Sequence, residues 1–130
     1  EGKNKVFFIK NSLKAKNYVY SAELYNLSKI INKRPELGII FEDIKKIAER
    51  GLIILFGSHA RGISKKDSDI DIYIETTNIS IKNKIKEMHS KVNVKIGKFD
   101  LNSLLIKEII KNHVIIRGVE EFYEKSRFFE

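Results

Sequence analysis

The chain has no cysteine, a single proline and no apolar run that approaches the length of a membrane span. Without cysteine it can form no disulfide, no thiolate zinc site and no cysteine nucleophile, and a reducing cytoplasm is its natural compartment. The longest apolar runs cover about five residues, whereas a transmembrane helix needs about 20. The basic N-terminal stretch also lacks the long apolar segment and the cleavage site of a signal peptide. We therefore expect a cytoplasmic protein without a membrane partner.

Hydrophobic residues make up 42% and charged residues 32% of the 130 residues, a balance typical of one globular domain with a real core. The formal net charge of +8 favours polyanionic partners such as nucleotides or nucleic acid. Lysine supplies 20 of the 25 basic residues, although arginine is the more frequent bidentate reader of phosphates. Charge alone therefore leaves nucleic-acid binding open. Abundant lysine and isoleucine with one proline also fits a heat-adapted or AT-rich source.

The first 51 residues are expected to form a short strand and two helices. Residues 4–10 fit a strand flanked by lysines, and apolar residues from Tyr20 to Ile31 recur at helical spacing. Pro35 suits the first turn of a second helix, and Gly51 is expected to cap its end.

The rest of the chain alternates strands and helices. We expect strands at residues 52–56, 69–74, 92–96 and 114–116, and helices near residues 81–88, 101–109 and 119–129. This order predicts an α+β fold with an α/β-like sequence of elements. Its centre would be a small twisted mixed sheet flanked by helices, preceded by an N-terminal helical pair.

The most informative stretch is a glycine-serine turn after a buried strand. The apolar run Leu52–Phe56 leads directly into Gly57 and Ser58. Because Gly57 lacks a Cβ, a phosphate can come close to the backbone there. Free amides at the start of a helix would add to the attraction for an anion. The turn therefore suits the phosphates of a nucleotide.

A pair of aspartates follows this turn. Asp69 and Asp71 alternate with isoleucines, which places both carboxylates on one face of a strand, with Cα atoms about 6–7 Å apart. Carboxylates at this spacing can share divalent ions. A phosphate-binding turn followed by such a pair is what metal-assisted transfer from a nucleoside triphosphate requires. The alternative is a surface turn followed by a solvated acidic strand.

Taken together, Gly57-Ser58, Arg61-Gly62 and Asp69-x-Asp71 resemble the signature of the DNA polymerase β-like nucleotidyltransferase superfamily. The resemblance is closest to its minimal nucleotidyltransferases, of archaeal type. It is dense over residues 52–75 and looser over residues 76–118. The composite motif is specific, because a lone Gly-Ser or Asp-x-Asp would mean little.

This resemblance implies roles for the motif residues. Asp69 and Asp71 would be the catalytic residues and would hold two Mg²⁺ ions, with Mn²⁺ as an alternative. Gly57 and Ser58 would bind the β- and γ-phosphates of the nucleoside triphosphate. Arg61 would contribute to nucleotide binding by pairing with phosphate.

Two residues near the turn admit structural alternatives. Arg61 can instead form a surface ion pair with Asp67. His59 can donate to a phosphate if neutral, but we expect an exposed ring.

Members of the superfamily carry a third carboxylate on a later strand, and here the sequence departs from the pattern. The strand at residues 92–96 should supply it, yet the matching position is Asn93, which can offer a carbonyl oxygen but no charge. Asp100 is the nearest downstream acid and the candidate third metal ligand. Its alternative role is the N-cap of the following helix.

The resemblance implies transfer of a nucleoside monophosphate, with AMP from ATP favoured, to an acceptor hydroxyl. Minimal nucleotidyltransferases resemble antitoxins whose partner is a nuclease of the HEPN class, so the implied acceptor is a tyrosine of a HEPN-type partner. The competing hypothesis is a catalytically degenerate module that senses nucleotide or binds a partner or DNA.

The resemblance also implies a division of the chain within one compact domain. Residues 51–130 would be the nucleotidyltransferase core, and residues 1–50 an N-terminal strand with two helices. Glu1–Lys10 resembles the end of a winged helix-turn-helix, so DNA binding by a missing N-terminal wing is one expectation. A simple edge strand at Val6–Ile9 is the alternative.

Overall fold

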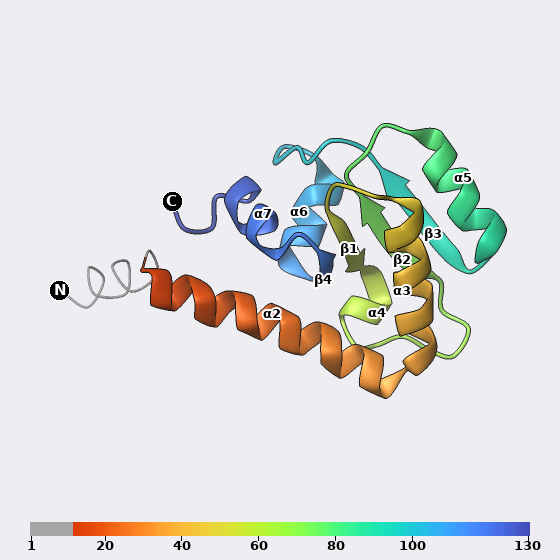
Figure 1. Cartoon of the computed structure of the whole chain (residues 1–130), viewed down its shortest axis with the longest axis horizontal. Coiled ribbons are helices and arrows are strands. Elements are labelled where there is room, and N and C mark those ends of the chain that lie inside the picture. The colour runs from red at the N-terminus through yellow and green to blue at the C-terminus, as the bar shows by residue number, and fades with distance from the viewer. Residues whose placement is uncertain (1–11) are drawn as a thin grey trace.

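The computed structural model describes residues 12–130, which form six helices and a four-stranded sheet (Figure 1). The expected strand at residues 4–10, and with it the end of a winged helix, lies outside the described residues. Within residues 12–130, no helix combines the length and the apolar character needed to cross a membrane.

The N-terminal helical pair forms as predicted. α2 (Leu13–Lys33) begins after Ser12, whose side chain accepts a hydrogen bond from the amide of Ala15 at 3.0 Å. α3 (Pro35–Ile47) starts with Pro35 in its first turn. Figure 1 shows α2 as a long helix along one side of the molecule, and it contacts α3, β4 and α7.

The predicted cap of α3 is wrong. The helix ends at Ile47, and the amide of Ala48 closes the last turn by donating to the carbonyl of Ile44 at 2.8 Å. Gly51 has a φ of +91° and instead lies against the residue that follows β2, because a Cβ there would be 2.4 Å from the carbonyl oxygen of Glu75. Glycine is needed for this close approach, which no local sequence pattern reveals.

The sheet is mixed, as predicted, with the strand order β3-β2-β1-β4. Its strands are β1 (Ile53–Phe56), β2 (Ile70–Ile74), β3 (Val92–Ile96) and β4 (Val114–Arg117). β1 runs antiparallel to β2 and β4, whereas β2 and β3 are parallel. The later helices are α4 (Gly57–Ala60), α5 (Ile79–Met88), α6 (Leu104–Lys111) and α7 (Val119–Lys125).

Helices cover both faces of the sheet. On one face, Ile72 and Ile74 of β2 pack in a cluster with Phe41 of α3 and Ile85 of α5. On the other, Tyr73 joins residues of α6 and α7 in a second cluster. The alternation expected for β2 is therefore present. The face that carries Asp71 is apolar beyond its first residue, so the acidic character is confined to the end of the strand.

Three strand ends meet at one edge of the sheet. β1 ends where β2 begins, because these strands are antiparallel, and β3 begins beside β2, because those strands are parallel. In this register Asp71 lies opposite Phe56 on one side and Asn93 on the other. The edge thus brings together segments that are far apart in sequence.

Candidate functional site

The turn after β1 is shaped by Gly57. Its φ of +72° is strained for other residues, and a Cβ there would lie only 2.2 Å from Oδ2 of Asp71. The carboxylate of Asp71 therefore packs directly against the backbone of the turn. The two halves of the motif, predicted from sequence separately, are in contact.

Asp71 is half-buried and bracketed by two neighbours. One carboxylate oxygen lies against Gly57, and the other, Oδ1, accepts a hydrogen bond from Nδ2 of Asn93 at 3.0 Å. Asn93 thus stands next to the first acid of β2, at the position where the superfamily pattern implies a third carboxylate. An amide there donates to Asp71 without adding a second negative charge.

Asp69 lies immediately before β2 and its side chain is exposed. The amide of the next residue, Ile70, donates to the carbonyl of Lys91 at 3.0 Å, which anchors the start of the strand. Asp69 therefore meets solvent at the same sheet edge, while Asp71 lies deeper. This graded exposure suits a ligand that approaches from the edge.

Ser58 and Arg61 belong to the short helix α4 and its end. Ser58 is half-buried, and its carbonyl accepts from the amide of Ile63 at 3.1 Å. Arg61 is exposed, and its side chain has no ion pair among residues 12–130. The alternative partner Asp67 pairs with Lys91 instead, at 3.7 Å. The Arg61 guanidinium is left available to an anionic ligand.

The expectation of an exposed His59 is wrong, since only 5% of the residue is accessible. Its Nε2 lies 3.3 Å from the carbonyl oxygen of Ser68, so the loop before β2 folds over the ring. Nδ1 is buried and has no hydrogen-bond partner within the described part of the chain. A buried polar atom of this kind is uncommon in native proteins.

Asp100 lies beyond the carboxyl end of β3, whereas Asn93 lies near its start. Its Oδ1 accepts from the amide of Asn102 at 2.9 Å in a turn, and the N-cap of α6 is Ser103. Among residues 12–130 there is no group of three or more His, Cys, Asp or Glu side chains placed to hold a metal ion. The structure therefore does not bring Asp100 together with Asp69 and Asp71.

The oxygen ligands at the sheet edge suit a Mg²⁺ site that is completed by a bound phosphate. Mg²⁺ prefers oxygen ligands, keeps several waters and is commonly bound by one or two carboxylates together with substrate phosphates. Asp69 and Asp71 supply the two carboxylates, and Asn93 offers an amide oxygen if its side chain turns. These residues fit an ion held jointly with a triphosphate and not an ion held by protein alone.

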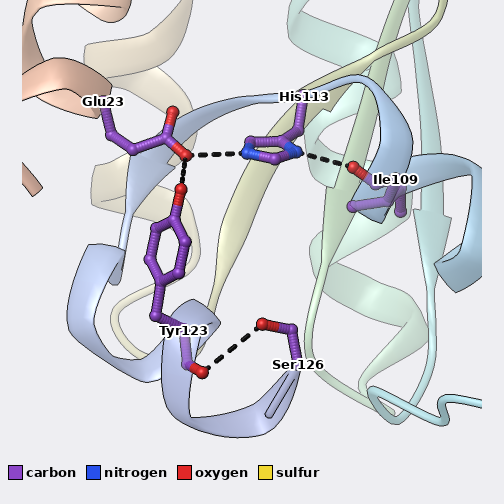
Figure 2. A network of polar contacts seen from close by, with 5 residues as sticks. All are labelled: Glu23, Ile109, His113, Tyr123 and Ser126. Carbon is purple, nitrogen blue, oxygen red and sulfur yellow. Dashed lines mark hydrogen bonds and ion pairs between the residues drawn. The ribbon is translucent and has the colours of Figure 1, made fainter. Parts of the chain in front are cut away.

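A second polar cluster, which the sequence did not predict, lies between α2, α7 and the start of β4 (Figure 2). Glu23 is buried, with 5% of its surface exposed, and its Oε2 is 2.8 Å from Nε2 of His113. The hydroxyl of Tyr123 also donates to Glu23, and Nδ1 of His113 donates to the carbonyl of Ile109 at 2.8 Å. Burial opposes the charge of Glu23, but the hydrogen bonds from His113, Tyr123 and Asn26 leave its pKa lowered.

A mixed sheet whose second strand starts beside a glycine turn is the architecture of the polymerase β-like nucleotidyltransferase core. The family model described as "Polymerase beta, Nucleotidyltransferase" matches residues 42–127, and the chain belongs to this family. No curated protein matches the chain significantly.

Among solved structures, one similar chain is described as the crystal structure of a toxin-antitoxin with AMP-PNP. The match has a TM-score of 0.52 and 17% sequence identity, and it covers 69% of this chain and 81% of the other. At this identity the likeness supports the fold.

Proposed function

We propose that the protein is a metal-dependent nucleotidyltransferase that moves AMP from ATP to a hydroxyl of a separate protein, a tyrosine of a HEPN-type toxin. In this role it would act as the antitoxin of a two-component system. Family membership supports the transferase class, and a similar fold occurs in a toxin-antitoxin structure with an ATP analogue.

The observation that carries the proposal is the contact between Gly57 and Asp71. A carboxylate that is half-buried against a glycine turn needs a compensating cation or donors, and only one of its oxygens has a donor among the described residues. A Mg²⁺ ion bound with a triphosphate would supply this charge and would polarise the α-phosphate for attack. The contact supports the proposal that the turn and the acid act on one ligand.

Each residue has a distinct part in the proposed reaction. Ser58 and the backbone at Gly57 would bind the terminal phosphates, and Arg61 would neutralise their charge. Asp69 and Asp71 would hold the ion. The acceptor oxygen would attack the α-phosphorus while the bond to the bridging oxygen breaks, so that pyrophosphate leaves and the hydroxyl proton passes to solvent.

The test is a transfer assay with labelled ATP, Mg²⁺ and the product of the neighbouring gene. We expect label on a tyrosine of the partner, and a loss of at least about 100-fold with Asp69→Asn or Asp71→Asn. Asp67→Asn is the matched control, because Asp67 is an exposed acid of the same loop and should leave transfer unchanged. Absence of label with the wild type, or equal labelling by Asp71→Asn, would contradict the proposal.

One observation favours a second candidate, a degenerate module that binds nucleotide without turnover. The amide of Asn93 already donates to Asp71 where a third acid would complete a metal site. Calorimetry and the transfer assay on Asn93→Asp separate the two candidates. Nucleotide binding without transfer, unchanged in Asn93→Asp, supports the module, whereas transfer by the wild type excludes it.

A further inference from the structure

Two neighbouring hollows form a trench along α2. Their volumes are about 340 Å³ and 380 Å³, and they share Asn26, Ala60 and His113 in their walls. The trench runs from Tyr18 to Lys33 on the α2 side, a helical length of about 22 Å, enough for six or seven residues of extended peptide. We call this surface the α2 trench.

The α2 trench is basic. Lys29 and Lys33 line one hollow and Lys111 the other, all three are exposed, and none has an ion-pair partner among residues 12–130. The single acid in the lining, Glu23, is buried and paired with His113, so it does not offset the lysines at the surface. Three unpaired ammonium groups around a groove favour an anionic occupant.

His59 supplies an independent indication of a ligand. His59 lines the hollow next to Lys29 and Lys33 and also the separate hollow that contains Ser68, and its Nδ1 is buried without a partner in the described part of the chain. Because the carbonyl of Ser68 can only accept, Nε2 carries a proton and Nδ1 is the atom left to pair. Nδ1 is then an acceptor, so a donor such as a backbone amide of a bound segment would satisfy it, whereas a carboxylate would not.

We propose that the α2 trench docks an acidic, extended segment of the acceptor protein. This inference rests on the proposed function, because it gives the acceptor a binding surface beside the turn that handles the nucleotide. Ala60 and Gly62, which line the trench, flank Arg61 of that turn.

The lining favours a peptide over single-stranded nucleic acid. Nucleic-acid grooves of that kind present several exposed rings on which successive bases stack. In the α2 trench only Tyr18 is an exposed aromatic residue, at 78%, while Tyr123 is buried in the cluster beneath.

The test measures fluorescence anisotropy of a labelled nine-residue peptide of Glu and Asp around one tyrosine. We expect the full chain to bind it, with about tenfold weaker binding by Lys29→Gln/Lys33→Gln. The matched control is Lys45→Gln/Lys46→Gln, which removes the same charge from the exposed end of α3 and should bind within about twofold of the wild type. A thermal melt of each variant checks that the fold is retained.

Three outcomes would contradict peptide docking in the α2 trench. They are no peptide binding, equal weakening of binding by both double variants, and displacement of the labelled peptide by an oligonucleotide of equal charge at a lower concentration than the unlabelled peptide requires. ATP binding is measured on the same proteins and should be unchanged by Lys29→Gln/Lys33→Gln. Peptide binding without ATP binding or transfer would contradict the proposed function alone. Transfer with no peptide binding would contradict the α2 trench alone.

Discussion

The carboxylates at the sheet edge and in the Glu23 cluster differ in how far the fold compensates their charge. Glu23 is buried and receives hydrogen bonds from His113 and Tyr123, so its charge is compensated within the fold. Within residues 12–130, Asp71 has a donor on one oxygen only, and its neighbour Asp69 is exposed. The first arrangement joins three elements, whereas the second leaves negative charge available to a ligand.

This difference in environment indicates that the Glu23 cluster contributes to stability, whereas the sheet edge is suited to binding a ligand. A buried pair that loses one partner leaves the other uncompensated, which costs about 3–5 kcal/mol. Asp71 is compensated only in part by the donor on one of its oxygens, so neutralising it removes little favourable interaction and changes stability little. Replacing the acid by its amide should therefore lower stability strongly in the Glu23 cluster and only slightly at the sheet edge.

The largest expected effect is on stability at Glu23. Glu23→Gln should lower the free energy of unfolding by about 3 kcal/mol, because the imidazole of His113 loses its carboxylate. Asp71→Asn should change it by less than about 0.5 kcal/mol, because an amide oxygen still accepts from Asn93. Urea unfolding of the two variants and the wild type measures both values. Equal destabilisation would remove the contrast between the regions.

The next effect is ligand stabilisation, which should depend on the edge and not on the cluster. Mg²⁺ with ATP should raise the unfolding free energy by about 2.7 kcal/mol at one hundred times the dissociation constant. ATP should add little without the ion, because the phosphates are bound partly through it. Thermal melts should show this gain in the wild type and Glu23→Gln, but a much smaller one in Asp71→Asn. If the melting temperature of the wild type does not change when Mg²⁺ and ATP are added together, the Asp-x-Asp is a solvated strand end.

The two regions also differ in what sequence could predict. The run before Gly57 and the alternation around Asp71 are local patterns, and the structure has β1 and β2 where those patterns placed them. The contact of Gly57 with Asp71 then follows from pairing two adjacent strands. Local information was enough for this part of the fold.

The Glu23 cluster had no local signal. Glu23 lies 90 residues from His113 and 100 residues from Tyr123, and on α2 it reads as an ordinary helix acid. The burial of His59 was missed for a similar reason, since it depends on how the loop through Ser68 folds over α4. Long-range packing determines which polar side chains pair. The helical and strand periodicities of apolar residues in the sequence contain no information about such packing.

The smallest expected effect is a pH dependence confined to the cluster. The pKa of Glu23 is lowered in the folded chain, because the hydrogen bonds from His113, Tyr123 and Asn26 outweigh the opposing effect of burial. A lowered folded pKa means that the stabilisation is complete above the ordinary glutamate pKa of about 4.3 and is lost as the pH falls through the folded value.

The difference in unfolding free energy between the wild type and Glu23→Gln reports this contribution at acidic pH, since the other carboxylates titrate in both proteins. That difference should shrink as the pH falls below about 4.3. Asp71→Asn, compared in the same way, should give a small difference that stays small over the range. A Glu23→Gln difference that persists undiminished to about pH 2.5 would show that Glu23 acts through packing and not through its charge.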